Sequence, residues 1–156
     1  MNMINNNILI IVPTTSLVEQ LYKDFKDYGF DVETNVSRKY HGYDIDEDKR
    51  IVISTWQSLY KMPKKFFEDY GAVIGDEAHL FKAVSLTKIM TKLTDCKYRI
   101  GLTGTLDDSK THKLVLQGLF GMVNKVVSTS ELIDRKQLAQ LKVCLLYTSD
   151  AADEGS

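Results

Sequence analysis

The stretch AVIGDEAH at residues 72–79 sets two adjacent carboxylates directly behind a short apolar run. The run Ala72–Gly75 has the length and apolar character of a strand buried in a parallel sheet. Ligands of such sheets bind at the carboxyl ends of the strands. Asp76 and Glu77 therefore suit nucleotide hydrolysis, the first helping to hold a magnesium ion between phosphates and the second orienting the attacking water. The alternative is that Asp76 only caps the next helical turn.

The rest of the sequence alternates between strand-like and helix-like segments. Further strands are predicted at Asn7–Val12, Asp31–Val36, Ile51–Thr55 and Arg99–Thr103. One helix is predicted after Pro13, because Ser16 and Glu19 have capping-box spacing and Gly29 marks an end. Others are predicted at Pro63–Tyr70, Ala83–Leu93 and Ser109–Leu119. We therefore expect an α/β fold with a mostly parallel sheet flanked by helices.

Polar residues also follow three other predicted strands. Thr103-Gly104-Thr105 offers two hydroxyls that can bond His79 and a phosphate or nucleic-acid group, although a plain turn is the alternative. Pro13-Thr14-Thr15 opens a helix whose first N–H groups suit a backbone phosphate, although capping alone would explain it. Ser54-Thr55-Trp56-Gln57 ends the third strand, and its Trp could stack on a base or fill the core.

Taken together, these segments form an ordered set. VPTTSLVEQ (12–20) resembles helicase motif Ia, STWQSL (54–59) motif Ic, GDEAH (75–79) motif II and GLTGTL (101–106) motif III. The chain therefore resembles the superfamily 2 DNA helicases, and over Ile8–Val143 it is similar to the recombination helicases of T-even phages.

The resemblance implies a RecA-like, ATP-driven motor that remodels branched DNA or RNA–DNA hybrids in recombination, repair or replication, with ATP and Mg²⁺ as cofactors. It makes Asp76 and Glu77 the magnesium and water carboxylates, with His79 beside them. It further implies that His79 and the motif III residues Thr103, Gly104 and Thr105 couple the nucleotide state to DNA. It places four residues near the DNA backbone: Thr14, Thr15, Thr55 and Gln57.

The chain departs from this family in one respect. A phosphate-binding loop needs Gly-x-x-x-x-Gly-Lys followed by Ser or Thr, and the sequence contains no Gly-Lys dipeptide. We therefore expect residues 1–143 to be a partial helicase ATP-binding domain that lacks its phosphate loop and its second RecA-like domain and is inactive alone. The end, CLLYTSDAADE (144–154), resembles a translated sequencing adapter, and a disordered acidic tail is the alternative.

Net charge and the length of the apolar runs limit which kinds of protein this chain can be. The 156 residues carry a net charge of -1, so any nucleic-acid contact must come from a local group of cations. Two such groups are present, and either could instead be a solvated surface: Arg38, Lys39, Tyr40, His41 and Tyr43 in one, Lys61, Lys64 and Lys65 in the other. The longest apolar run, Ile8–Val12, is far shorter than the roughly 20 residues of a membrane span.

The two cysteines indicate the redox compartment, and the sequence bears on three alternative functions beside the helicase. Cys96 and Cys144 lack the spacing of a metal site or a disulfide framework, which favours a reducing cytoplasm, in keeping with a phage-infected bacterial cell. A restriction-system or remodeller-type translocase motor and a non-enzymatic nucleic-acid-binding module stay open. A metal-dependent phosphohydrolase would need further His or Asp ligands at strand ends, and the sequence offers no such set.

Overall fold

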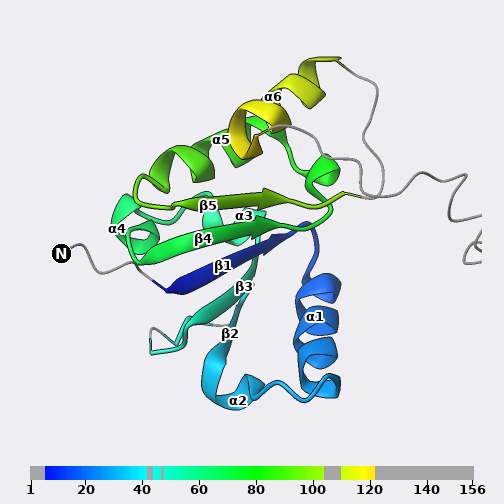
Figure 1. The fold of residues 1–156 in the computed structure, drawn as a ribbon, viewed down its shortest axis with the longest axis vertical. Helices are drawn as coiled ribbons and strands as arrows, with labels where there is room; N and C mark the ends of the chain where they lie inside the picture. The colour runs from blue at the N-terminus through cyan, green and yellow to red at the C-terminus, as the bar shows by residue number, and fades with distance from the viewer. Residues whose placement is uncertain (1–5, 42–43, 47, 104–109, 122–156) are drawn as a thin grey trace, which may run out of the picture. The chain divides into compact units, whose positions relative to one another are not determined.

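The computed structural model describes residues 6–41, 44–46, 48–103 and 110–121 (Figure 1). The chain divides into two units, Met1–Met122 and Val123–Ser156, and the second lies outside the described residues. The predictions for residues 144–156 therefore also lie outside them, as do those for Gly104, Thr105 and Tyr43. All described residues belong to the first unit.

A five-stranded, fully parallel sheet forms the centre of this unit. Its strands lie in the order β2-β3-β1-β4-β5. Their bounds are β1 (Asn7–Val12), β2 (Val36–Lys39), β3 (Ile51–Thr55), β4 (Tyr70–Gly75) and β5 (Tyr98–Gly101). Helices follow β1, β3, β4 and β5 along the chain, which confirms the predicted α/β fold with a parallel sheet flanked by helices.

Helices cover the two faces of the sheet unequally. The helices are α1 (Thr15–Asp27), α2 (Val32–Asn35), α3 (Trp56–Leu59), α4 (Lys64–Phe67), α5 (Ala83–Lys92) and α6 (Lys110–Phe120), with a 3₁₀ turn, η1 (Ala78–Leu80). Figure 1 shows α1 and α2 beside β1, β2 and β3, and α5 and α6 beside β5. Helices α3, α4, α5 and α6 pack on the face opposite α1.

The alternation of side chains along β1 explains the two layers. Ile10 and Val12 pack with residues of α1 and α2 in one core. Leu9 and Ile11 point the other way and pack with residues of α3, α4, α5 and α6 in the second core. Successive side chains of a strand point to opposite faces, so a continuous apolar run is required where both faces are covered. No helix in the described part of the chain has the length and apolar character to cross a membrane.

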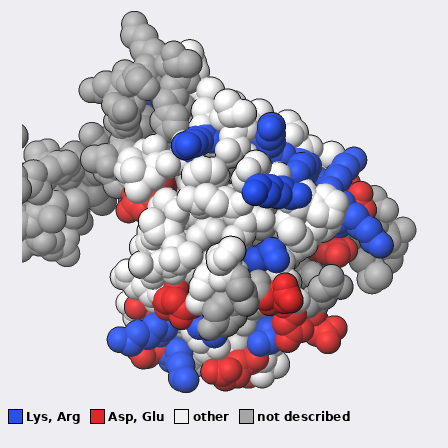
Figure 2. Space-filling view, turned by 180° about the vertical axis from the view of Figure 1, so that it is seen from behind, with Lys and Arg blue, Asp and Glu red and all other residues white. Residues whose placement is uncertain are grey.

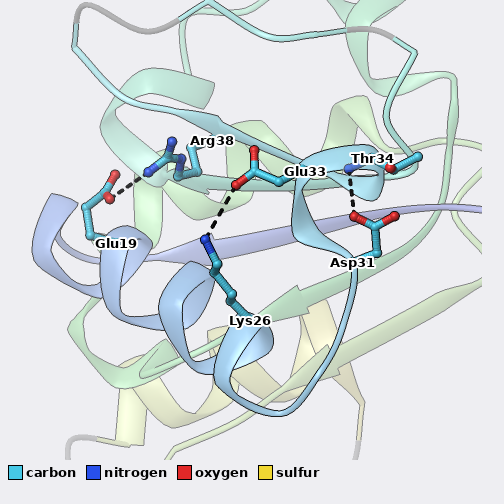
Figure 3. Close-up of polar contacts among 6 residues, drawn as sticks. All are labelled: Glu19, Lys26, Asp31, Glu33, Thr34 and Arg38. Carbon is cyan, nitrogen blue, oxygen red and sulfur yellow. Dashed lines mark hydrogen bonds and ion pairs between the residues drawn. The ribbon is translucent and has the colours of Figure 1, made fainter.

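The strand predicted at Asp31–Val36 is wrong. The structure forms the short helix α2 there, and the strand β2 begins only at Val36. The Asp31 carboxylate accepts a hydrogen bond from the Thr34 N–H at 3.2 Å (Figure 3). The side chain of Thr34, and after it the Thr34 N–H, hold the pKa of Asp31 below its ordinary value. The local cap therefore outweighed the strand propensity of the flanking valines.

The capping box at Ser16 and Glu19 was also wrong. The N-cap of α1 is Thr14, whose hydroxyl accepts the Leu17 N–H at 3.3 Å. Glu19 instead accepts hydrogen bonds from Arg38 at 2.7 Å and from the Tyr40 hydroxyl at 2.5 Å.

Two further boundaries differ from their predictions. The helix predicted at Pro63–Tyr70 is limited to α4, because Tyr70 already begins β4. The strand predicted at Arg99–Thr103 is β5, which begins at Tyr98 and ends at Gly101, so Thr103 lies beyond it.

Candidate functional site

The carboxyl ends of four strands meet at one edge of the sheet. The register pairs Ile11 of β1 with Gly75 of β4, and Gly75 with Gly101 of β5. On the other side of β1, Val12 pairs with Thr55 of β3. The residues that follow these positions therefore lie side by side, as expected for Thr14, Asp76 and Thr103.

Asp76 is held at the end of β4 by contacts with its neighbours. Its N–H donates to the Ile11 carbonyl at 2.9 Å, which ties it to β1. Its Oδ1 accepts the N–H of Glu77 at 3.0 Å. Oδ2 makes no hydrogen bond with any described residue, so it is open to a ligand.

Glu77 has an unusual backbone conformation. Its φ of 50° and ψ of 44° lie in the left-handed region, and it is the one described residue other than glycine with positive φ. Such a conformation costs an L-residue on the order of 1 to 3 kcal/mol and is often found at functional sites. The chain reverses here into η1, whose Ala78 N–H donates to the Leu102 carbonyl at 3.0 Å. The strained turn therefore joins the ends of β4 and β5.

His79 connects the two strand ends through its side chain. Its Nδ1 lies 2.6 Å from the Thr103 hydroxyl and 3.2 Å from Oε2 of Glu77. Nδ1 carries either one hydrogen or one lone pair. If Nδ1 is protonated, it donates to one of these two oxygens, and if it is not, the Thr103 hydroxyl donates to it. The contact between His79 and Thr103 expected from the sequence is present.

Phe120 packs against the glycines at the ends of β4 and β5. The ring of Phe120 in α6 lies against Gly75 and Gly101, where an added Cβ would come within 3.0 Å of ring carbons at either position. Phe81 lies 3.2 Å from such a Cβ at Gly75. Sequence reasoning missed this contact, although the repeated Ile-Gly before DEAH and before LTGTL was a usable signal.

The residues expected near nucleic acid have different exposures. Thr14 and Thr15 are exposed at the start of α1, and Thr14 caps it. Gln57 is exposed, and its side-chain amide donates to the Pro13 carbonyl at 3.2 Å, linking the ends of β3 and β1. Thr55 is only 4% exposed and shares a hydrogen bond with Ser58, so its side chain does not face solvent. Trp56 packs partly against the core.

The described residues contain no group of three or more His, Cys, Asp or Glu side chains that could by itself hold a metal ion. Mg²⁺ often keeps several waters and takes only one or two protein carboxylates, together with oxygens of its substrate. The open Oδ2 of Asp76, with Glu77 next to it, fits this pattern. Cys96 is buried, and burial raises the pKa of its thiol, so it is a structural residue.

Comparison with known proteins adds to this geometry. The family described as type III restriction enzyme, res subunit, matches residues 1–108, more than half of the chain. The chain belongs to this family. As a res subunit family member, it is 36% identical to the ATP-dependent DNA helicase uvsW of Enterobacteria phage T4 over 144 residues. That match covers 90% of this chain and 29% of the T4 protein.

Solved structures give the same assignment. The crystal structure of T4 UvsW matches 81% of this chain and 26% of that chain, with 37% identity and a TM-score of 0.70. The SWI2/SNF2 ATPase core of Sulfolobus solfataricus, solved in complex with dsDNA, matches 75% of this chain and 25% of that chain. Its identity is 22% and its TM-score 0.53, so it supports the fold alone. The parallel sheet flanked by helices is thus that of a RecA-like helicase domain.

Proposed function

We propose that this chain works as part of an ATP-dependent DNA helicase and that the edge formed by β4 and β5 is its site of ATP hydrolysis. The observation that carries the proposal is the pair of carboxylates at the end of β4, linked through His79 to Thr103 after β5. The likeness to an ATP-dependent DNA helicase supports ATP as the nucleotide.

The two carboxylates have different surroundings, which suit different tasks. Oδ1 of Asp76 is engaged by the Glu77 N–H, which leaves Oδ2 as the oxygen to hold Mg²⁺. A bound Mg²⁺ would neutralise charge on the phosphates. The side chain of Glu77 is 39% exposed, and its position beside His79 suits a base that orients and polarises water. The left-handed backbone of Glu77 ends the extended conformation directly after Asp76.

His79 and Thr103 suit the coupling of hydrolysis to movement. A change in the position of Glu77 alters the contact that it makes with Nδ1, and this nitrogen also contacts Thr103. Movement on one strand end can therefore reach the other through a single imidazole ring. Gly104 and Thr105 of the same motif are proposed to take part, although they lie outside the described residues.

The proposed substrates are branched DNA and RNA–DNA hybrids in recombination, repair or replication. Thr14, Thr15 and Gln57 are proposed to lie along the nucleic-acid backbone at the ends of β1 and β3. The burial of Thr55 favours a supporting role for it beneath Gln57. The family description favours a second candidate, a restriction-system translocase that moves along duplex DNA without separating the strands.

The chain spans 29% of the T4 relative, so the proposal is tested in a longer protein. The matching segment of T4 UvsW is replaced by residues 8–143 of this chain, and DNA-stimulated phosphate release is measured. A cooperatively folded chimera that hydrolyses ATP supports the proposal, and one that folds but shows no hydrolysis overturns it. Unwinding of a branched duplex would identify a helicase. Displacement of a triplex strand without unwinding would identify a translocase.

The 156-residue chain alone is expected to release no measurable phosphate. Its sequence contains no Gly-Lys dipeptide and so offers no phosphate loop to hold the nucleotide. Phosphate release by the purified chain, after removal of contaminating nucleotidases, would contradict this expectation.

A further inference from the structure

Five exposed lysines lie on the layer formed by α3, α4 and α5. They are Lys61, Lys64, Lys65, Lys82 and Lys88, here called the lysine surface. None of them forms a salt bridge with a described residue. Figure 2 shows Lys and Arg side chains gathered in the upper right of the face that it draws, with few acidic side chains among them.

Hydrogen bonds between α5 and the segment that joins α3 to α4 bring these lysines together. The ammonium group of Lys92, at the end of α5, donates to the carbonyls of Tyr60 at 2.9 Å and Met62 at 2.7 Å. Lys61 lies between those two carbonyls in the sequence, and Lys64 begins α4 just after them. Lys88 is one turn before Lys92 on α5.

The lysine surface reaches the strand-end edge through Lys82. This residue precedes α5, and its ammonium group lies 6.0 Å from the centre of the Trp56 ring. Trp56 follows Thr55 at the end of β3, next to Gln57. The lysines therefore extend from the candidate site across the helix layer.

Three cations on the other half of the unit are paired with carboxylates. Lys26 pairs with Glu33 at 3.8 Å, and Arg38 pairs with Glu19 at 2.7 Å (Figure 3). Lys49 pairs with Asp46 at 3.8 Å. Arg38 also lies over the Tyr22 ring at 4.0 Å, so this arginine is engaged within the protein. These three cations have carboxylate partners, whereas the five members of the lysine surface have none among the described residues.

We propose that the lysine surface binds the sugar-phosphate backbone of nucleic acid without reading base sequence. The proposal rests on the proposed helicase function and extends its nucleic-acid path beyond the strand-end edge. Helix α5 has 10 residues and so is about 15 Å long, the length of about four phosphates along one strand of duplex DNA. Lysine supplies a point charge to phosphates, whereas base recognition needs side chains that match base edges.

Continuity with Trp56 and Gln57 favours nucleic acid over an acidic protein as the partner. A half-buried aromatic ring beside cations is common along backbone-tracking grooves. The bound phosphates would release counterions, so the affinity should fall steeply with salt.

The test compares two variants of the full 156-residue chain that lose the same charge. In one, Lys61, Lys64 and Lys65 are changed to Gln, and in the control Lys23, Lys26 and Lys49, which lie outside the lysine surface, are changed to Gln. Binding to a fluorescein-labelled oligothymidylate and to a mixed-sequence duplex is followed by anisotropy over a series of salt concentrations. A separate Lys82→Gln, Lys88→Gln variant tests α5 independently, and thermal unfolding verifies that each variant folds.

The lysine-surface variant is expected to bind at least about tenfold more weakly at low salt and to lose about one unit of salt slope for each phosphate-binding lysine. The control should stay near the unmodified chain. Equal affinities of the two variants would overturn the proposal, and so would an unmodified chain that binds neither nucleic acid, the result expected if the partner is an acidic protein. Binding requires no hydrolysis, so these outcomes are independent of the chimera's ATPase.

Discussion

The two halves of the sheet differ in how completely they are covered. In the half formed by β1, β2 and β3, Ile10, Val12 and Ile53 are buried under α1 and α2, and Leu9 and Val52 are buried on the opposite face. In the half formed by β4 and β5, the α6 side is covered by Phe120. The other side leaves three large apolar residues about half exposed: Tyr98, Ile100 and Leu102.

The candidate site lies on the less covered half. Asp76, Glu77 and Thr103 follow β4 and β5, whereas β2 carries the paired Arg38 and contributes with β1 and β3 to a buried core. Regions with fewer buried contacts open more easily, and the moving parts of proteins are drawn from them. The difference therefore indicates a stable base in β1–β3 and a more adaptable functional edge in β4–β5.

The largest effect should come from equal truncations in the two halves. Ile53→Ala removes a fully buried side chain of β3 and should cost about 2 to 5 kcal/mol of unfolding free energy. Ile100→Ala in β5, where the residue is 47% exposed, should cost much less, about 1 kcal/mol or below. Urea unfolding followed by circular dichroism measures both. Equal losses would remove the proposed difference between the halves.

A smaller effect tests the contact beneath the site. Gly75→Ala forces the Phe120 and Phe81 rings to move and should destabilise the protein by about 1 to 3 kcal/mol. Gly118→Ala, in α6, meets no atom within 4 Å and should instead stabilise the helix by up to about 1 kcal/mol. Thermal unfolding of the two variants would show shifts of opposite sign. A neutral Gly75→Ala would mean that the rings adjust freely.

The smallest effect concerns the start of α1 on the covered half. Thr14→Ala removes the N-cap and should cost about 1 kcal/mol. Ser16→Ala lies within the helix, where its hydroxyl caps nothing, and should change stability little. Urea midpoints of the two variants decide between them. A larger loss at Ser16 would restore the capping box read from the sequence.

The strands could be predicted because their apolar runs are unambiguous. β1, β3 and β4 are continuous runs of buried or half-buried residues, and polar residues follow each of them in the sequence. The pairing of His79 with Thr103 could also be predicted, because both residues lie a few positions beyond strands whose ends the motifs place at one edge.

Other features depend on contacts that a sequence pattern does not contain. The helix α2 depends on one local cap at Asp31, and the start of α1 on which of three neighbouring hydroxyls takes the cap. The packing of Phe120 on Gly75 joins residues 45 positions apart in the sequence. The burial of Thr55 depends on the tertiary packing around the end of β3.

The most direct test of the account is the role of Glu77 in the chimera with T4 UvsW. Glu77→Gln should keep ATP binding and lower kcat by about 100-fold or more, because it removes the base beside His79. The control Glu33→Gln removes a carboxylate that pairs with Lys26 on the covered half and should leave kcat unchanged. Steady-state phosphate release with saturating DNA measures both variants. A Glu77→Gln chimera with the kcat of the parent chimera would contradict the assignment of this strand end as the hydrolytic site.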